Sequence, residues 1–447
     1  MNVTVGIRRE DKNRWERRVP LIPEDVAYLT RKKGFKIAVQ PSAIRAYPDQ
    51  NYLDAGAEIR EDLTDCAVIL GVKEITPPRL QPERIYLFFS HTIKGQNYNM
   101  PMLRLLIEGR STLIDYECIR DRHGSRLVFF GRHAGLAGMI DSLYAMGQRA
   151  AHFGWSTPFC QLKQTMEYDS LDQARSDLRR IGGLIREGGV PRQLAPLVCG
   201  IAGYGHVSRG AQEILDLLPV RRVKPEQLAT LPADRTDCIY KVVFQEKDMV
   251  RLRENPVPFE LKHYFDSPEQ YEGVFSKYLP HLTLLINAIY WDDRYPRLVT
   301  WQWLEKSQRG RPRKLLVIGD LSCDINGAVE CTVKATEPDS AVYCVDPLNR
   351  RVSDGYGGEG ILILAVDNLP AEIPREASES FSATLRPFLP PLLHADFQVP
   401  FPALRLPAEL KKAVIVYRGR LTPDYVYLAE KLLQGEKSSS KKPKGDL

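Results

Sequence analysis

Short apolar runs alternate with amphipathic stretches along the first 130 residues. The runs "NVTVGI", "FKIAV", "CAVILGV", "YLFF" and "TLID" are typical of buried strands. Between them, "IPEDVAYLTRKKG" and "NMPMLRLLIEG" have the spacing of amphipathic helices. The first of these has a proline and acids in its first turn and a glycine after its basic end, as helices prefer. Strands that alternate with helices in this way predict a parallel sheet covered by helices.

A second alternating region follows a long helix predicted from about residue 136 to 153. Its strands are "PLVCGIAG", "TLLINAIYW" and "KLLVIGDLSCD", and a hairpin-like segment begins at "AVYCVDPLNRR". Residues 245–280 are charged and aromatic, and within them residues 254–273, "ENPVPFELKHYFDSPEQYEG", are interpreted as a long loop. A helix is predicted after Pro374. The end of the chain, 434–447, is poor in apolar residues and is expected to be disordered.

One strand of this second region leads directly into a glycine turn, "LVCGIAGYGHVSRGAQEIL". Gly203 and Gly205 occupy the first two positions of a GxGxxG pattern, Ser208 occupies the third, and Gly210 follows two residues later. The first glycine permits the tight turn, and the second lets the backbone approach a pyrophosphate at the helix N-terminus. Because the pattern follows a strand and opens an amphipathic helix, we expect all four residues to bind a dinucleotide. The alternative is a purely structural turn.

The choice between NAD and NADP is read from the segment about 20 residues beyond the first glycine. Here the sequence is "PVRRVKPEQL", with Arg222 and Lys224 and no acid at the strand end. Basic groups suit a ribose 2′-phosphate, so NADP (NADPH) is predicted as the cofactor. The alternative is that these charges are only solvated.

Composition and charge exclude several classes of protein. Among 447 residues, 43% are hydrophobic and 26% are charged, which is ordinary for a globular protein, and a net charge of +6 is too weak to indicate nucleic-acid binding. No apolar run approaches a membrane span, and no signal or transit pattern stands at the start, so a cytoplasmic location is expected. The eight scattered cysteines form no CxxC pair, and no metal is expected.

Two apolar runs of the first region end in titratable side chains. Lys73 and Glu74 follow "CAVILGV", and His91 follows "YLFFS". Open α/β sheets bind their ligands at the carboxyl ends of the strands, so the two strand ends predict one site. Each residue also has a structural alternative, a solvated ion pair for Lys73 and Glu74 and a hydrogen-bonded core histidine for His91.

Longer stretches of the chain resemble one family. "VKE", "FFSHTIKGQNYNMP", "LIDYE", "GYGHVSRGAQEIL", "GDLSCDINGAVECT" and "GEGILILAVDNLPAEIP" are similar to the lysine–2-oxoglutarate reductase half of aminoadipic semialdehyde synthase. The resemblance extends from about residue 3 to 430 and, more faintly, to saccharopine dehydrogenase and alanine dehydrogenase. It implies an α/β fold of two Rossmann-like domains with parallel sheets and an active-site cleft between them. The substrate domain would contain 1–133 and 371–433, and the NADP-binding domain 134–370.

The resemblance also implies roles for single residues. Lys73, His91, Glu117 and Glu16 match the catalytic positions, and Arg18 and Arg126 match residues that bind the substrate carboxylates. Asp320 and Asp324 match aspartates at the nicotinamide end of the cofactor site. The implied reaction, a step of lysine catabolism, joins L-lysine and 2-oxoglutarate through an imine, which is reduced at C2 to saccharopine.

The chemistry of that reaction suits these groups. The ε-ammonium of lysine must lose a proton before it attacks a ketone, and a neutral Lys73 could take it if a cation such as Arg18 lowers its pKa. The carbonyl oxygen must leave as water, and His91 titrates in the right range to supply the proton. Sequence leaves open which of Lys73 and His91 acts at each step.

Two other functions are weighed against this one. A related NAD(P)-dependent reductive aminase, or opine-type dehydrogenase, would join another amino acid to an oxoacid. A non-catalytic sensor would keep the cofactor fold, and the presence of both Lys73 and His91 speaks against it. The expected partners are small molecules, with no nucleic acid and no membrane. The oligomeric state is left open, with a homodimer among the alternatives.

Overall fold

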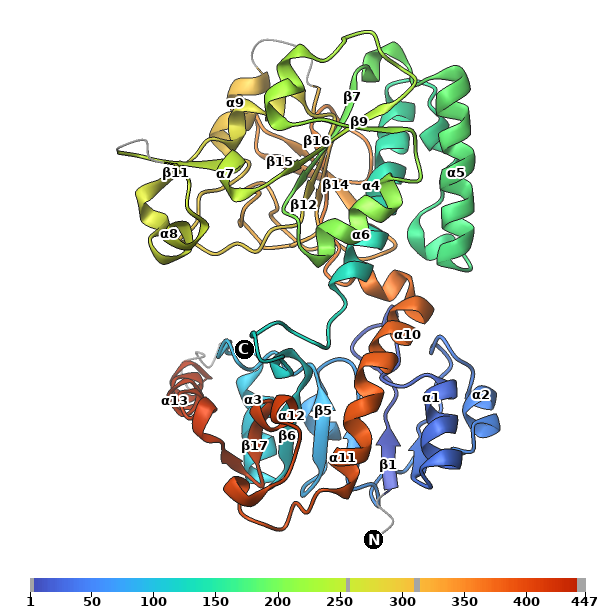
Figure 1. The fold of residues 1–447 in the computed structure, drawn as a ribbon, viewed down its shortest axis with the longest axis vertical. Coiled ribbons are helices and arrows are strands. Elements are labelled where there is room, and N and C mark those ends of the chain that lie inside the picture. Colours follow the sequence, from blue (N-terminus) through green and yellow to red (C-terminus); the bar gives the residue numbers. More distant parts are fainter. Residues whose placement is uncertain (1–3, 255–257, 309–313, 440–447) are drawn as a thin grey trace, which may run out of the picture. The chain divides into compact units, whose positions relative to one another are not determined.

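The computed structural model describes residues 4–254, 258–308 and 314–439. Within it the chain forms two compact units. Unit 1 contains residues 1–130 and 374–447, and unit 2 contains residues 131–373. Unit 2 is therefore an insertion in unit 1, which Figure 1 shows as one blue-and-red unit and one green-to-orange unit. The crossings expected from the sequence lie after residues 133 and 370.

The sheet of unit 1 has, within the described residues, eight strands in the order β18-β17-β6-β5-β4-β1-β2-β3. The six strands from β6 to β3 are parallel, and β17 is antiparallel to β6. The strands are β1 (Thr4–Ile7), β2 (Lys36–Val39), β3 (Glu58–Ile59), β4 (Val68–Leu70), β5 (Ile85–Phe88), β6 (Thr112–Asp115), β17 (Val414–Tyr417) and β18 (Arg420–Leu421). All residues of β4, β6 and β17 are buried, as expected of strands covered on both faces.

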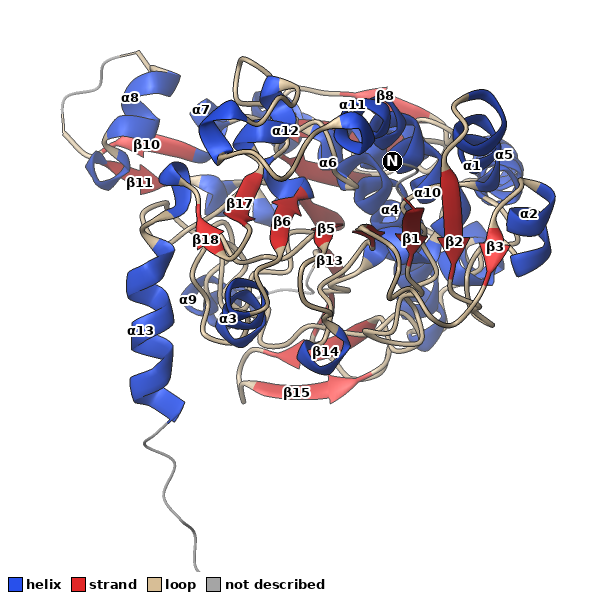
Figure 2. Ribbon diagram, turned by 90° about the horizontal axis from the view of Figure 1, so that it is seen from below, coloured by secondary structure: helices blue, strands red, loops and turns tan. Residues whose placement is uncertain are grey.

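Helices cover both faces of this sheet. Figure 2 shows α3 on one face and α11 and α12 on the other. Apolar side chains from both sets, such as Leu103, Leu392 and Leu410, join one core with the strands. The helices of unit 1 are α1 (Pro23–Ala27), α2 (Asp49–Asp54), α3 (Met100–Glu108), α10 (Pro374–Leu385), α11 (Leu389–His394), α12 (Ala408–Lys412) and α13 (Leu428–Ser439).

The sheet of unit 2 also has eight strands within the described residues, in the order β15-β14-β16-β13-β12-β7-β9-β8. The six from β16 to β8 are parallel, whereas β14 is antiparallel to both its neighbours. The strands are β7 (Leu197–Ala202), β8 (Val220–Arg222), β9 (Ile239–Phe244), β12 (Leu284–Asn287), β13 (Val317–Asp320), β14 (Val342–Asp346), β15 (Arg351–Asp354) and β16 (Ile361–Leu364). The prediction of two Rossmann-like α/β folds is confirmed, with antiparallel strands at one edge of each sheet, where connections are short.

Two hydrophobic cores lie against the sheet of unit 2. One packs α4, α5 and α6 on the strands, and the other is built largely from the segment between β9 and β13. The helices are α4 (Gly131–His152), α5 (Leu171–Gly188), α6 (His206–Leu215), α7 (Glu246–Met249), α8 (Leu261–Asp266) and α9 (Trp301–Gln308).

One local prediction was wrong. The segment 254–273 is not one long loop, because α8 lies within it and β11 (Tyr271–Gly273) pairs antiparallel with β10 (Val250–Leu252), just before it. Its tyrosines and phenylalanines are part of a packed aromatic cluster, which makes a charged segment fold. The disorder expected for 434–447 stays a prediction, since α13 continues to Ser439 and 440–447 lie outside the described residues. Within the described ranges no helix is both long and apolar enough to cross a membrane.

Candidate active site

The predicted catalytic residues of unit 1 follow adjacent strands of one sheet. Lys73 follows β4, His91 follows β5 and Glu117 follows β6, while Glu16 and Arg18 lie in the segment after β1. β1 is the strand at which the order reverses, since β2 lies on one side of it and β4 on the other. Ligands of open α/β sheets bind at the carboxyl ends beside this switch point. The structure therefore brings all five residues to one edge of the sheet.

The Lys73 ammonium lies where its charge is disfavoured. Burial lowers the pKa of Lys73, and the nearby charges of Arg18 and Lys12 lower it further. Glu16 acts in the opposite direction but does not reverse the shift. A lysine amine with a lowered pKa can hold and release a proton closer to neutral pH than an exposed one.

Glu16 and Arg18 form a buried ion pair. Arg18 Nε donates to Glu16 Oε1 at 2.7 Å, Arg18 Nη2 donates to Glu16 Oε2 at 2.5 Å, and the side chains are 2% and 0% exposed. The Arg18 guanidinium also lies 4.2 Å over the ring of Phe130. A bidentate pair of this kind fixes the guanidinium in place, so Arg18 acts on Lys73 as a fixed positive charge.

His91, Glu117 and Arg126 form a row. The Nδ1 atom of His91 lies 3.6 Å from Glu117 Oε2, and Arg126 makes an ion pair with the other carboxylate oxygen of Glu117. Burial raises the pKa of Glu117, but the hydrogen bond of His91 and the charge of Arg126 outweigh it, and the pKa is lowered. Glu117 is thus held as a carboxylate that can orient the imidazole and stabilise its protonated form.

The backbone of His91 adopts an uncommon conformation. Its φ is +52°, in the left-handed region, and the Nδ2 atom of Asn99 donates to its carbonyl oxygen at 3.0 Å. Its ring stacks on Phe89 with centroids 6.0 Å apart and an interplanar angle of 12°. These contacts hold a strained residue whose side chain is still 37% exposed, a combination that is frequent at functional sites.

Asp115, which was not predicted, connects the strand ends that carry His91 and Glu117. Asp115 Oδ2 accepts from the backbone N–H of Ser90 at 3.0 Å and from the Ser90 hydroxyl, and Asp115 Oδ1 accepts from the N–H of Glu117 at 2.8 Å. Burial raises the pKa of Asp115 to about 6. An acid that ends an otherwise apolar strand was the available signal in the sequence.

Glu10 performs the same task for Lys73 and was also missed. Its carboxylate accepts from the N–H groups of Val72 at 2.7 Å and of Lys73 at 3.0 Å, and Arg8 lies 3.6 Å from it. Burial raises the pKa of Glu10 to about 7, against the opposing charge of Arg8. In the sequence Glu10 is one charge in a charged run, so no local pattern distinguishes it.

In unit 2 the backbone of the glycine turn requires glycine at position 203 and leaves open space beside Gly205. Gly203 has a φ of +97°, and a Cβ there would lie 2.8 Å from the carbonyl oxygen of Ala288. Gly205 is the N-cap of α6, and a Cβ there would meet nothing within 4 Å. Open space beside a helix N-terminus at the switch strand β7 fits the pyrophosphate of a dinucleotide, and these two residues could hold it.

Ser208 and Gly210, which the sequence predicts to bind the cofactor, make close contacts within unit 2. Ser208 is fully buried, and its hydroxyl accepts from Gln212 Nε2 at 3.1 Å. A Cβ on Gly210 would lie 2.0 Å from the carbonyl oxygen of Arg132 in α4. Gly210 therefore lets α4 and α6 approach closely, and the cofactor role of both residues stays a prediction.

Arg222 and Lys224 do not lie beside the glycine strand. β8, which ends at Arg222, is the edge strand, and β9 lies between it and β7. Arg222 is 74% exposed and pairs with Asp216 at 3.1 Å. The strand end next to Gly203 is that of β9, where the N–H of Gly203 donates to Phe244 and the residues that follow are Gln245 and Glu246.

Asp320 and Asp324 follow the end of β13. Asp320 accepts from Asn287 Nδ2 at 2.8 Å and from the Thr332 hydroxyl at 2.5 Å, and burial raises its pKa to about 6. Its carboxyl group therefore joins β12 to β13. Asp324 is exposed, and its backbone carbonyl accepts from the N–H of Gly327 at 2.8 Å.

Comparison with known proteins places these features in a family. The model of "Alanine dehydrogenase/PNT, N-terminal domain" matches residues 6–137, and that of "Alanine dehydrogenase/PNT, C-terminal domain" matches residues 240–424. An L-alanine dehydrogenase structure matches with a TM-score of 0.57 at 20% identity, covering 96% of this chain and 100% of that one. The transhydrogenase from Sinorhizobium meliloti matches with a TM-score of 0.52 at 16% identity, covering 94% and 100%. These two likenesses show a shared fold.

Curated relatives extend the similarity to almost the whole chain. Alpha-aminoadipic semialdehyde synthase from Arabidopsis thaliana is 40% identical over 446 residues, 96% of this chain and 41% of that protein. The mitochondrial protein of the same name from Mus musculus is 36% identical over 95% of this chain and 47% of its own length. The chain thus spans less than half of each. Saccharopine dehydrogenase [NAD(+), L-lysine-forming] from Neurospora crassa is 26% identical over 87% of this chain and 91% of its own length.

Proposed function

We propose, on the premise that the chain belongs to the alanine dehydrogenase/PNT family, that it reductively condenses L-lysine with 2-oxoglutarate to form saccharopine. The observation that carries the proposal is the row of titratable groups at the carboxyl edge of unit 1. It combines a lysine of lowered pKa with a histidine oriented by a carboxylate. Similarity to aminoadipic semialdehyde synthases over most of the chain gives the substrate class.

Lys73 would act first, as the base. Its lowered pKa lets the neutral amine accept a proton from the ε-ammonium of the substrate, which can then attack the ketone carbon of 2-oxoglutarate. The adduct must next lose its hydroxyl group as water, and His91 would supply that proton while Glu117 stabilises the imidazolium. A nicotinamide nucleotide, when bound, supplies the hydride that reduces the resulting imine at C2.

Arg18 and Arg126 would contribute differently to binding of 2-oxoglutarate, which is a dicarboxylate. Arg18 is 2% exposed and already bidentate with Glu16. Arg126 is 44% exposed, so part of its guanidinium faces solvent while one nitrogen contacts Glu117. Arg126 is therefore the better placed to receive a substrate carboxylate, and Arg18 would act mainly as the charge beside Lys73.

For the cofactor, the sequence predicts NADPH, and the glycine turn supports a nicotinamide dinucleotide. One observation favours NADH instead. Glu246 follows β9, the strand beside the glycine turn, and an acid in that place suits a free ribose 2′-hydroxyl and repels a 2′-phosphate. The basic residues on which the NADPH prediction rested lie one strand further out. The ratio of kcat/KM for the two nucleotides decides between them.

A spectrophotometric assay tests the activity. Oxidation of NADPH or NADH is followed with lysine and 2-oxoglutarate together and with each omitted. Lys73→Met and His91→Gln should each lower kcat on the order of 10²-fold, as loss of an acid–base group does. Lys94→Met, next to the same turn, serves as the matched control and should keep most of the activity. Turnover that does not depend on lysine would refute the proposal.

The alternative is a reductive aminase or opine-type dehydrogenase that uses another amine. Replacing lysine in the assay with ornithine, alanine or glutamate distinguishes the two, because only the amine changes. We also propose that the protein is cytoplasmic, as its sequence suggests. The name of the Mus musculus relative contains the word mitochondrial, so cell fractionation tests this point. Light scattering of the purified protein tests for a homodimer.

A further inference from the structure

A groove with a volume of about 1480 Å³ lies in unit 1 at the edge opposite the candidate active site. It reaches the first residues of three neighbouring strands, Val68 of β4, Ile85 of β5 and Thr112 of β6. The candidate catalytic residues follow the other ends of the same strands. At about 3.3 Å per residue the two edges are roughly 10 Å or more apart, so the amino-edge groove is a separate site.

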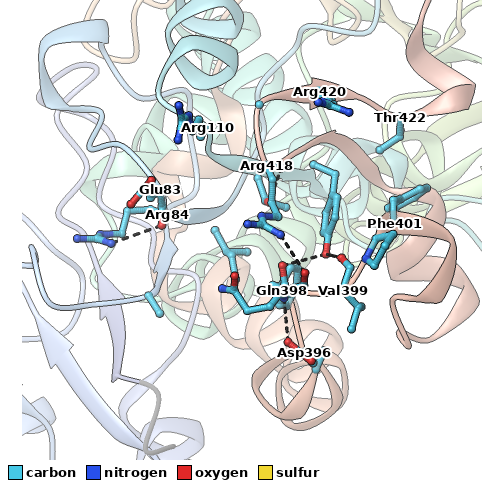
Figure 3. A pocket seen from close by; sticks show the side chains of 18 of the residues that line it. Glu83, Arg84, Arg110, Asp396, Gln398, Val399, Phe401, Arg418, Arg420 and Thr422 are labelled. Atoms are coloured by element: carbon cyan, nitrogen blue, oxygen red, sulfur yellow. Dashed lines mark hydrogen bonds between the residues drawn. The ribbon is translucent and has the colours of Figure 1, made fainter.

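Four arginines line the amino-edge groove, Arg84, Arg110, Arg418 and Arg420. Figure 3 shows Arg84, Arg110 and Arg418 around one part of it, with Arg420 beyond Arg418. In the described part of the chain none of the four has a carboxylate within 4.0 Å, although every candidate active-site arginine does. Two acids, Glu83 and Asp396, also line the groove, so its four guanidinium groups exceed its carboxylates by two and leave a net positive charge that attracts anions.

Two of these arginines have a left-handed backbone conformation, which favours glycine or asparagine. Arg110 follows the C-cap of α3 with a φ of +51°, at the position where helices commonly place glycine. Arg418 and Gly419, with φ of +49° and +80°, form the two-residue turn between β17 and β18, where Asn-Gly is the usual pair. Glu83, at +58°, lines the same groove. Side chains held on strained backbone around one cavity are a feature of functional sites.

The opposite wall is apolar and firmly held. The Tyr417 hydroxyl donates to the carbonyl of Phe397 at 3.0 Å and to that of Val399 at 2.6 Å. The rings of Phe397 and Phe401 lie 6.2 and 5.4 Å from that of Tyr417, measured between centroids. Arg418 Nη1 donates to the carbonyl of Gln398 at 2.9 Å, which connects the basic and apolar walls. The groove is therefore preformed.

We propose that the amino-edge groove binds an organic anion that carries two or more phosphate or carboxylate groups on an apolar or aromatic body. The guanidinium groups match the anionic groups, since arginine binds either one through paired N–H donors. The aromatic wall matches the body. Ordinary ligand pockets measure about 300–1,000 Å³, so the groove has room for a ligand as large as a nucleotide. The proposal does not depend on the reaction proposed above.

Two probes distinguish phosphate from carboxylate as the anionic group that the groove binds. Isothermal titration of the full chain uses ATP as the polyphosphate and benzene-1,2,4-tricarboxylate as the polycarboxylate. Arg110→Gln replaces one non-glycine residue with another, so the cost of the left-handed backbone at this position stays about the same. The substitution removes one guanidinium for which the described residues provide no hydrogen-bond partner. Arg405→Gln, on an exposed residue outside the groove, is the matched control.

For at least one probe we expect Arg110→Gln to weaken binding by about tenfold or more, as loss of a charge-assisted hydrogen bond does, and Arg405→Gln to leave it unchanged. Arg420→Gln should reproduce the loss, which guards against a folding defect in the first variant. The probe that responds identifies the anionic group. Equal affinity of wild type, Arg110→Gln and Arg420→Gln for both probes overturns the proposal, and so does binding of neither probe. ATP that binds at the glycine turn of unit 2 would do so equally in all variants. A difference in affinity between the variants therefore reports on the groove alone.

Discussion

Two carboxyl groups are buried against each other in unit 2, and they predict a pH-dependent stability that one substitution should remove. Asp141 of α4 is 1% exposed, and Glu372, shortly after β16, is 6% exposed. The N–H of Thr165 donates to Asp141 Oδ1 at 2.8 Å. Within the described residues, Asp141 Oδ2 and both carboxyl oxygens of Glu372 are buried without such a donor. A proton held between the two carboxyls joins two of these three oxygens, so the pair favours a singly ionised state.

The sign of the effect follows from the direction in which folding moves the two pKa values. Burial raises the pKa of both groups, and the charge of Asp141 raises that of Glu372 further. A carboxyl whose pKa is raised by folding contributes stability that is fully present below its unfolded pKa. That contribution is lost as pH rises through the folded pKa. Unit 2 should therefore lose stability between acidic and alkaline pH on account of Glu372, by about 1.4 kcal/mol for each pH unit by which folding raises its pKa.

Glu372→Gln tests this reasoning, because glutamine keeps the shape and can donate to Asp141 as a protonated Glu372 does. At pH 8 the variant should unfold at a higher temperature than wild type, by about 2–4 °C for each kcal/mol that ionisation of the pair costs a domain of this size. As the pH is lowered to 5 and wild-type Glu372 takes up its proton, the two midpoints should converge. The measurement is the midpoint of thermal unfolding by calorimetry across this pH range.

A control separates the pair from a simple loss of charge. Glu187→Gln removes one carboxylate of unit 2 at an exposed position on α5, and its curve should run parallel to that of wild type. If Glu372→Gln were less stable than wild type at both pH values, or if its pH dependence equalled that of wild type, the shared proton would be refuted.

Three further predictions concern packing and the candidate active site. Gly210→Ala should destabilise by about 1–3 kcal/mol in urea unfolding, because its Cβ would overlap α4, whereas Gly183→Ala, with nothing within 4 Å, should stabilise by about 0.5–1 kcal/mol. Asp115→Asn turns an amide group toward a buried N–H and should cost about 1–3 kcal/mol, measured in the same way. Lys12→Met removes a charge that lowers the pKa of Lys73, so the limb of the pH–rate profile due to Lys73 should move to higher pH.

Local sequence pattern predicted the strand ends of unit 1 because each depends on a few consecutive residues. A buried strand is visible in the sequence as an apolar run. The first titratable residue after it, such as Lys73 or His91, lies at the carboxyl edge of the sheet, whichever strands are its neighbours. The glycine turn is equally local, since the left-handed backbone of Gly203 and the open N-cap at Gly205 lie within a few consecutive residues.

What sequence could not supply was the order of the strands. Asp115 and Glu10 act on residues of neighbouring strands, and the bonds exist only because β5 lies beside β6 and β4 beside β1. The assignment of Arg222 and Lys224, which stays a prediction, meets the same difficulty. It assumed that the next strand along the chain is the next strand in the sheet, whereas β9 lies between β8 and the glycine strand. The packing of α4 on Gly210 was likewise absent from the local pattern, because α4 comes much earlier in the chain.

The two edges of the unit 1 sheet differ in how their charges are balanced, and that difference bears on what each can bind. At the carboxyl edge the candidate arginines are held by acids, Arg18 by Glu16 and Arg126 by Glu117. The charge of Arg18 is thus used largely to lower the pKa of Lys73, while Arg126 keeps part of its guanidinium exposed to a substrate carboxylate. At the amino edge, in the described part of the chain, Arg110 and Arg418 have no acid within reach, so their charge is available to an outside anion. One sheet therefore separates a site whose arginines are paired with acids from a site whose arginines, among the described residues, are not, and strand length keeps the two apart.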